Sequence, residues 1–195
     1  MLPWRRACWV SEFTLHTPRL VLRDWREGDI APFHAMCRDP QVMRFVGPDL
    51  TRGQTAAAVA GYRNERTRDG HGFRAVELRK TGRFIGFCGV RTASPGTPLT
   101  GEPELGWRLA KTYWGQGYAR EAATASIDWA FANLHDDRVL AMTAPANARS
   151  WGLMVRLGME HRPDLDFGHR TPRPGRGGHR AHVVYSVNRT AWGRS

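Results

Sequence analysis

The sequence is short of cysteine, lysine and long apolar runs, and each shortage argues against a class of protein. Its three cysteines, Cys8, Cys37 and Cys88, are odd in number and far apart, which disfavours a disulfide framework and a zinc ribbon. We expect them to act as small apolar packing residues. No apolar run approaches the roughly 18 residues of a membrane helix, and we expect no export signal at the start of the chain. A cytoplasmic protein without a membrane partner is therefore predicted.

Lysine is nearly absent. Lys80 and Lys111 are the only two, so arginine supplies almost all of the excess behind the formal net charge of +11. The arginines are spread along the whole chain, and no run of five or six like charges occurs. This spacing favours solvated arginine-rich faces over a nucleic-acid-binding stripe, although the charge does favour polyanionic or acidic ligands. Direct binding of nucleic acid is thus the less favoured interpretation.

A length of 195 residues fits one domain. We expect a loose extension over residues 1–15, with Trp4 and Trp9 in it, and a single α/β domain with a mixed sheet over residues 16–190. Periodicity and turn signals predict strands over residues 17–23, 73–78, 83–90, 104–109, 138–143 and 182–187, and helices over residues 27–38, 51–68, 119–134 and 148–157.

Two segments carry more specific expectations. In the helix predicted over residues 51–68, Gln54, Ala57, Ala58 and Tyr62 could share one face. The segment from residue 162 to 178 is rich in Pro, Gly, Arg and His and is predicted to be a long loop.

The segment WGQGYA, residues 114–119, joins a predicted strand to a predicted helix. Its glycines lack Cβ atoms, so backbone N–H groups can approach a bound anion, and the helix start adds unpaired N–H groups and a positive dipole end. A diphosphate is the natural ligand. A Walker loop would need a Gly-Lys-Ser/Thr sequence at the helix start, and a dinucleotide fingerprint would need a third glycine where Arg120 stands.

Three separated segments together resemble the GNAT N-acetyltransferases, in particular the RimJ/RimL-type branch that acetylates protein N-termini. They are TPRLVLR at residues 17–23, ELGW at 104–107 with YWGQGYAREA at 113–122, and NARS at 147–150 followed by RLGM at 156–159. In the superfamily pattern [QR]-x-x-G-x-[GA], Gly117 and Ala119 fit, while Trp114 occupies the Gln/Arg position, where aromatic residues are common in this branch.

The resemblance implies a single GNAT-type domain with a mixed, mostly antiparallel sheet, flanking helices and a central parallel pair of strands that splay apart. Acetyl-CoA would be the acyl donor, with its pantetheine arm paired to the exposed backbone of Trp107 and Leu109. Asn147 would either reach the pantetheine or cap the helix after it. The implied coenzyme-binding residues are Trp107, Arg108, Leu109, Trp114, Gly115, Gln116, Gly117, Tyr118, Ala119, Arg120 and Asn147.

The acetyl transfer would proceed by direct attack of a primary amine in a ternary complex, without a metal. Glu104 is the candidate base, acting through water, and its alternative role is an ordinary strand-end carboxylate paired with an arginine. Ser150 is the candidate proton donor to the leaving thiolate, and its alternative role is to support the helix start. Positioning of the reactants alone can supply about 7–11 kcal/mol in favourable cases.

The acceptor is the least specified part of this interpretation. A protein or peptide N-terminus is favoured, a small amine such as a polyamine or aminoglycoside comes second, and a non-catalytic nucleic-acid-binding module on the same fold comes third. His169 and Tyr185 are candidates for the acceptor mouth. His179 and His182 lack metal-ligand spacing on a helix, and the resemblance is compatible with a homodimer.

Overall fold

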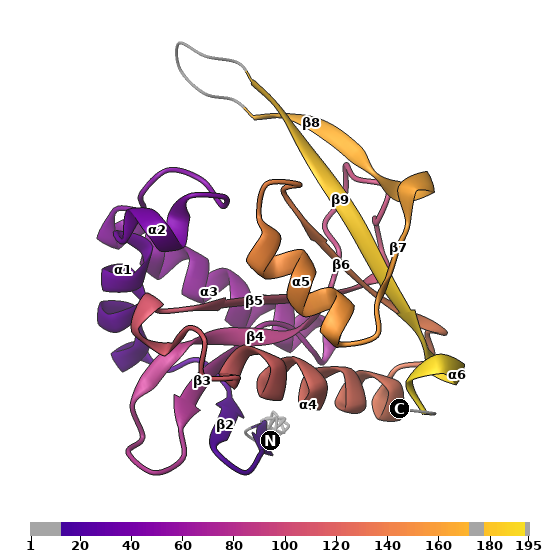
Figure 1. Ribbon diagram of the computed structural model, residues 1–195. Helices are drawn as coiled ribbons and strands as arrows, with labels where there is room; N and C mark the ends of the chain where they lie inside the picture. The colour runs from indigo at the N-terminus through magenta and orange to yellow at the C-terminus, as the bar shows by residue number, and fades with distance from the viewer. Residues whose placement is uncertain (1–12, 172–177, 194–195) are drawn as a thin grey trace, which may run out of the picture.

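The computed structural model describes residues 13–171 and 178–193 (Figure 1). In chain order the elements are β1 (Thr14–His16), β2 (Leu20–Arg23), η1 (Glu27–Asp29), α1 (Ile30–Cys37), α2 (Pro40–Met43), α3 (Arg52–Asp69), β3 (Arg74–Leu78), β4 (Phe84–Thr92), β5 (Pro103–Leu109), η2 (Lys111–Tyr113), α4 (Tyr118–Asn133), β6 (Arg138–Thr143), α5 (Ala148–Arg156), β7 (Glu160–His161), η3 (Pro163–Leu165), β8 (Phe167–Thr171), β9 (Gly178–Asn188) and α6 (Arg189–Trp192).

The strands form one mixed sheet in the order β1-β2-β3-β4-β5-β6-β9-β7, with β8 paired to β9 outside this path. Every neighbouring pair is antiparallel except β5 and β6, which run parallel. These two strands share a single register pair, Glu104 with Leu140, and part beyond it. The predicted fold class, with its splayed central pair, is therefore confirmed.

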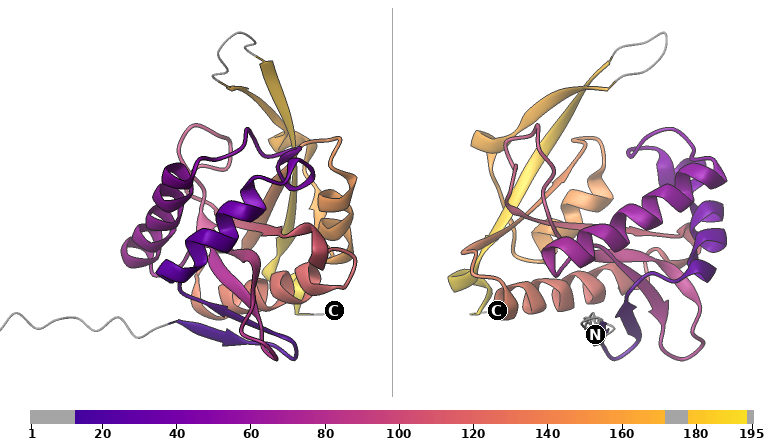
Figure 2. Two further views of the ribbon diagram at one scale, coloured as in Figure 1. Left: turned by 90° about the vertical axis from the view of Figure 1, so that its left-hand side faces the viewer. Right: turned by 180° about the vertical axis from the view of Figure 1, so that it is seen from behind.

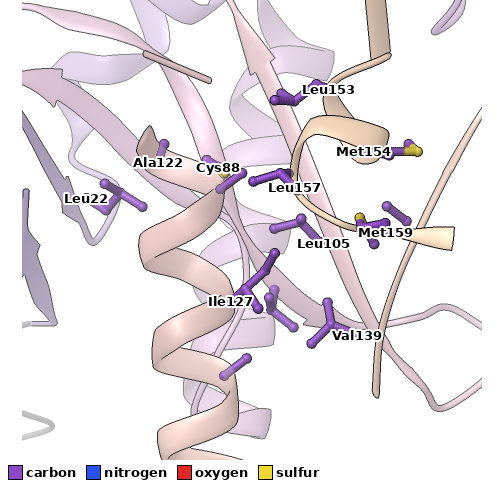
Figure 3. Close-up of a cluster of buried hydrophobic side chains, with 14 of the residues drawn as sticks. Leu22, Cys88, Leu105, Ala122, Ile127, Val139, Leu153, Met154, Leu157 and Met159 are labelled. Atoms are coloured by element: carbon purple, nitrogen blue, oxygen red, sulfur yellow. The ribbon is translucent and has the colours of Figure 1, made fainter. Parts of the chain in front are cut away.

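Helices cover both faces of the sheet (Figure 2). Helix α4 packs on β4 and β5 through Ala122, Ala123, Ile127 and Ala130, which are all buried. Three of these four are alanines, so the helix axis can lie close to the strands. Figure 3 shows Ile127 and Ala122 in one apolar cluster with Leu105 of β5 and with Leu153 and Met154 of α5.

The opposite face is covered by α1, α2 and α3 over an aromatic cluster that includes Trp25, Phe33, Phe73 and Phe87. The Trp25 indole Nε1–H donates to the Phe73 carbonyl at 2.9 Å, which satisfies its polar atom inside the cluster. Cys37 and Cys88 are buried free thiols, as expected of packing residues. Cys8, Trp4 and Trp9 lie outside the described residues.

Of the four residues expected to share a face of α3, Ala58 and Tyr62 pack against the aromatic cluster, whereas Gln54 and Ala57 do not. Thr51 caps this helix: its Oγ1 accepts from the Gln54 N–H at 3.2 Å, and the Gln54 side chain accepts from the Thr51 N–H at 2.8 Å. This capping box turns Gln54 outward at the helix end. The buried residues are accordingly Thr55 and Val59, while Gln54 and Ala57 are exposed.

Two short elements lie at or near boundaries where none was expected from the sequence. Asp39 and Pro40 end α1, but they also begin α2, because Asp39 Oδ1 accepts from the Gln41 N–H at 2.8 Å and Pro40 occupies the first turn. At the N-terminal side, β1 pairs with β2 from Thr14 to His16. The boundary expected at residue 16 therefore falls inside a strand.

The loop predicted over residues 162–178 is wrong at residues 167–171, which form β8, while residues 172–177 lie outside the described residues. β8 pairs with the first half of β9, from Phe167 opposite His182 to Thr171 opposite Gly178, and the two form a ribbon that projects from the sheet (Figure 1). The composition suggested a loop because few apolar residues alternate there, whereas the ribbon is held by its backbone ladder. No helix in the described part of the chain is long and apolar enough to cross a membrane.

Candidate active site

A groove of about 390 Å³ lies where β5 and β6 part. One wall is β5 from Glu104 to Arg108, and the facing wall is the end of β6 with the start of α5. The aromatic rings of Tyr62, Phe73 and Phe87 line it from the α1–α3 side. Its size falls in the range of sites that hold small molecules.

Glu104 lies at the point where β5 and β6 last pair, and it lines the groove. Its side chain is only 8% exposed, and Oε2 accepts from Arg91 Nε at 3.1 Å and lies 3.0 Å from Arg91 Nη2. Arg91 itself lies over the Phe73 ring, 4.9 Å from its centroid. The carboxylate thus has the arginine partner that its alternative role requires, and it also faces the groove.

The start of α5 forms the other wall. Asn147 occupies the N-cap position without capping the helix; its Nδ2 donates instead to Thr143 Oγ1 of β6 at 3.0 Å. Ser150 lies one turn further on and also lines the groove. Within the described residues its hydroxyl makes no hydrogen bond, so it is available to a ligand. Glu104 of β5 and Ser150 of α5 therefore line one groove from its two walls.

The loop between η2 and α4 has the geometry of an anion site. Gly115 and Gly117 have φ of 73° and 81°, in the left-handed region that favours glycine. The first helical hydrogen bond is from the Glu121 N–H to the Gly117 carbonyl at 3.0 Å. Within the described part of the chain, none of the six backbone N–H groups of residues 115–120 donates a hydrogen bond. Six adjacent unpaired donors at a helix start fit a diphosphate.

The N-terminal segment anchors this loop through Glu121. Thr17 Oγ1 donates to Glu121 Oε1 at 2.6 Å, and Arg19 donates to both Glu121 oxygens, from its N–H at 2.8 Å and from Nε at 2.6 Å. Arg19 Nη1 also donates to the Gln116 carbonyl at 2.9 Å, and its guanidinium lies over the Tyr118 ring at 4.5 Å.

These bonds set the charge state of the Glu121 carboxyl. Partial burial raises its pKa, but the hydrogen bonds from Thr17 and Arg19 outweigh burial and hold the pKa below its usual value. From the sequence, Thr17 and Arg19 were expected only to form part of a strand, and their hydrogen bonds to Glu121 were missed. Their contact with Glu121 spans more than 100 residues of chain, so no local signal could reveal it.

The main chain of β5 faces the gap at alternate residues. The Ala110 N–H donates to the Ile85 carbonyl of β4 at 2.9 Å, so the N–H and C=O groups of Trp107 and Leu109 point away from β4. Trp114 Nε1 donates to the Leu109 carbonyl at 2.8 Å, which leaves Trp107 the freer of the two. Arg149 of α5 lies over the Trp114 ring at 5.0 Å.

Arg108 is placed differently from the other expected coenzyme-binding residues. Its side chain lies on the α1–α3 face of the sheet, where its Nη1 donates to Cys37 Sγ and to Met43 Sδ at 3.7 Å. The strand pleat explains this, because neighbours along β5 point to opposite faces. The Arg108 N–H and C=O alternate with those of Trp107 and Leu109 and face β4, so what Arg108 presents to the groove is its side chain.

Among the tail residues, His182 lines the groove and Tyr185 does not. Tyr185 stacks on His161 with their centroids 5.1 Å apart, and the side chains of His169 and His179 lie outside the described set. No feature of the sequence indicated that His182 faces the groove. Across residues 13–171 and 178–193, no three His, Cys, Asp or Glu side chains gather in a way that could hold a metal ion.

A family model, two relatives and a crystal structure are similar to this chain. The family model described as "Acetyltransferase (GNAT) domain" matches residues 19–160. The protein YkkB of Bacillus subtilis is 31% identical over 150 residues, which cover 75% of this chain and 85% of YkkB. The FsC-acetyl coenzyme A-N(2)-transacetylase of Aspergillus fumigatus is 30% identical over 189 residues, which cover 92% of this chain and 77% of that protein. The crystal structure of an acetyltransferase from Agrobacterium tumefaciens superposes with a TM-score of 0.75 at 29% identity, covering 95% of this chain and 99% of that one.

Proposed function

The chain belongs to the GNAT acetyltransferase family and is an N-acetyltransferase, and from this premise we propose that its acceptor is the terminal α-amine of a protein or peptide, as in the RimJ/RimL-type branch. The observation that supports this most is the groove between β5 and β6, which Glu104 and Ser150 line together. The transacetylase name of the Aspergillus fumigatus relative is consistent with acetyl-CoA as donor and a nitrogen as acceptor.

The protonation of the amine favours an N-terminus over a lysine side chain. Attack requires a neutral amine, and an α-amine has a pKa of about 8 whereas a lysine amine has one of about 10.4. Deprotonation at neutral pH therefore costs an α-amine less than about 1.5 kcal/mol, against roughly 4–5 kcal/mol for lysine. A modest base is sufficient for the first substrate, and Glu104 supplies one carboxylate at the groove.

Each wall of the groove has a role in the proposal. The six N–H groups of residues 115–120 bind the diphosphate of acetyl-CoA, and the free main-chain groups of Trp107 pair with its pantetheine arm. Glu104 takes the proton of the amine through a water molecule. Asn147 holds the pantetheine side of the groove from its bond to Thr143. Ser150 donates a proton to the departing thiolate. This stabilises the leaving group, because an alkyl thiol has a pKa of about 8.5.

A Ser150→Ala variant is expected to lower kcat by about 10-fold to 100-fold, because loss of a positioned proton donor weakens general acid catalysis. The affinity for acetyl-CoA is expected to persist, since the hydroxyl makes no hydrogen bond that holds the described structure together. Initial rates of thiol release, combined with calorimetric titration of acetyl-CoA, measure both quantities. Retention of full activity would assign Ser150 a structural role only.

The acceptor proposal is tested by following thiol release from acetyl-CoA with a panel of amines. Peptides with free N-termini are expected to be acetylated with higher kcat/KM than the same peptides blocked at the N-terminus and carrying an internal lysine, and than spermidine or an aminoglycoside. A preference for the small amines would instead identify a small amine as the acceptor. Salt-sensitive binding of RNA with no response to acetyl-CoA would favour a nucleic-acid-binding role instead.

A further inference from the structure

Three charged groups besides His182 line the groove, and two of them neutralise each other. Glu104 is paired with Arg91, which also lies 3.8 Å from Glu65. The third is Arg108. In the described part of the chain, no carboxylate lies within ion-pair distance of the Arg108 guanidinium, whose positive charge is therefore uncompensated inside the groove.

Among the described residues, the two buried arginines, Arg23 and Arg74, have carboxylate partners. Arg23 is held by Asp29 and Glu77 at 2.7 Å each, and Arg74 by Asp24 at 2.6 Å. This is the usual arrangement, because a charge removed from water needs an opposite charge or strong hydrogen bonds. Arg108, which is half-buried, lines the groove without such a partner.

The Arg108 guanidinium is nevertheless held in a defined position. It lies over the Phe87 ring, 5.3 Å from its centroid, and its Nη1 contacts two sulfur atoms at 3.7 Å, which are weak acceptors. Its Nε and Nη2 make no hydrogen bond among the described residues. A planar guanidinium with two free donor nitrogens suits a carboxylate, which it can bind through two parallel hydrogen bonds.

The walls near Arg108 strengthen such a contact. Tyr62 and Phe73 line the same part of the groove, and the Tyr62 ring lies 5.6 Å from the Phe87 ring. Aromatic walls exclude water and lower the effective dielectric, so a charge pair there is stronger than at the surface. Burial also raises the pKa of the Tyr62 phenol, which keeps that hydroxyl a hydrogen-bond donor.

The spacing of Glu104 and Arg108 limits the shape of the acceptor. Both side chains lie on the same face of β5, four residues apart, and a strand rises by about 3.3 Å per residue, so their Cα atoms are separated by roughly 13 Å. In a free α-amino acid, the carboxylate and the amine are bonded to the same carbon. When the amine lies near Glu104, the carboxylate therefore lies too far from Arg108 to contact it. A carboxylate several bonds further along the ligand can reach it.

We propose that Arg108 selects acceptors that carry a carboxylate a few bonds from the reacting amine, which in a peptide substrate is an Asp or Glu side chain at the second or third position. The inference rests on the proposed N-terminal acetylation. A non-peptide amine with a distant carboxylate offers the same chemistry, so the test includes both sources. Arg108 acts here on the choice of acceptor, and no chemical step passes through it.

The test compares matched acceptors: a short peptide with Asp at position two, its Asn isostere, its Lys counterpart, and an ω-amino carboxylic acid. We expect the Asp peptide to exceed the Asn peptide by about 10-fold or more in kcat/KM, mainly through KM, as for a hydrogen bond to a charged group. In Arg108→Gln this ratio is expected to fall to about 1. In Arg108→Glu the preference is expected to pass to the Lys peptide, a gain that misfolding cannot produce.

Arg83 is an exposed arginine in the β3–β4 turn, and Arg83→Gln is the matched control. This variant is expected to keep the preference for the Asp peptide. Equal rates on Asp and Asn peptides by the parent protein would overturn the role of Arg108 and leave N-terminal acetylation intact. A preference for the ω-amino acid over every peptide would keep the carboxylate contact and assign it to a small molecule. Absence of acetylation on all peptides and on the ω-amino acid would overturn both proposals.

Discussion

Gly117→Glu is expected to weaken the binding of acetyl-CoA by about 100-fold, which corresponds to about 2.7 kcal/mol. Position 117 has φ of 81°, a conformation that L side chains rarely adopt. A Cβ there would lie 3.2 Å from Arg19 Nη2 and would disturb the anchor of the loop. The new carboxylate would also stand among the six free N–H groups, where it competes with the diphosphate and repels it.

Two further variants separate these causes. Gly117→Ala carries the backbone strain without the charge and is expected to have an intermediate affinity. Gly96→Glu makes the same change at another left-handed glycine, with φ of 95° and no atom within 4 Å of an added Cβ, in the loop before β5. It is expected to bind acetyl-CoA as the parent protein does. Calorimetric titration measures all three, and an unaltered affinity in Gly117→Glu would mean that the diphosphate binds elsewhere.

Glu104→Gln is expected to lower kcat on a peptide N-terminus by about 100-fold near neutral pH, within the range for removal of a general base. Glutamine has nearly the same shape, and its amide oxygen can still accept from Arg91, so the groove is expected to keep its form. The variant can no longer take up a proton. Its rate is therefore expected to follow the fraction of amine that is already neutral, rising with pH towards the amine pKa of about 8.

The control for this change is Glu102→Gln. Glu102 is a second carboxylate at the start of β5 with an arginine partner, Arg138 Nη2 at 2.7 Å, but it does not line the groove. It is expected to leave kcat and the pH–rate profile unchanged. The measurement is kcat between pH 6 and 9.5 for both variants. A Glu104→Gln profile that overlays that of the parent protein would remove Glu104 as the base.

The sequence was most informative where glycine, proline and alternating apolar residues coincide. β6 was predicted with the bounds that the structure has, and the strands predicted over residues 73–78 and 83–90 correspond to the antiparallel pair β3 and β4. β8 was missed because Phe167 is its only large apolar residue, and periodicity cannot detect a strand stabilised mainly by backbone pairing. α2 was missed because the signal that ends one helix, Asp-Pro, also caps the next.

For the site, residue types indicated the chemistry but not the contacts. The glycines of the loop predicted a backbone anion site, and the unpaired N–H groups of residues 115–120 are consistent with it. The ion pair of Glu104 with Arg91 depends on the pairing of β4 with β5, which sets Arg91 opposite Glu104. The isolated charge of Arg108 became visible only once the three-dimensional arrangement showed which carboxylates are distant from it.

The bond between Thr17 and Glu121 also bears on the order in which the site can be assembled during synthesis. Thr17 leaves the ribosome about 100 residues before Glu121 does, so this bond cannot fix the diphosphate loop until most of the chain is available. Contacts of such long sequence separation form late in folding. Acetyl-CoA would then bind only to the completed domain and shift the equilibrium away from partly folded chains. Cutting the protein back to residue 19, where the family match begins, would discard β1 and the Thr17 hydroxyl together.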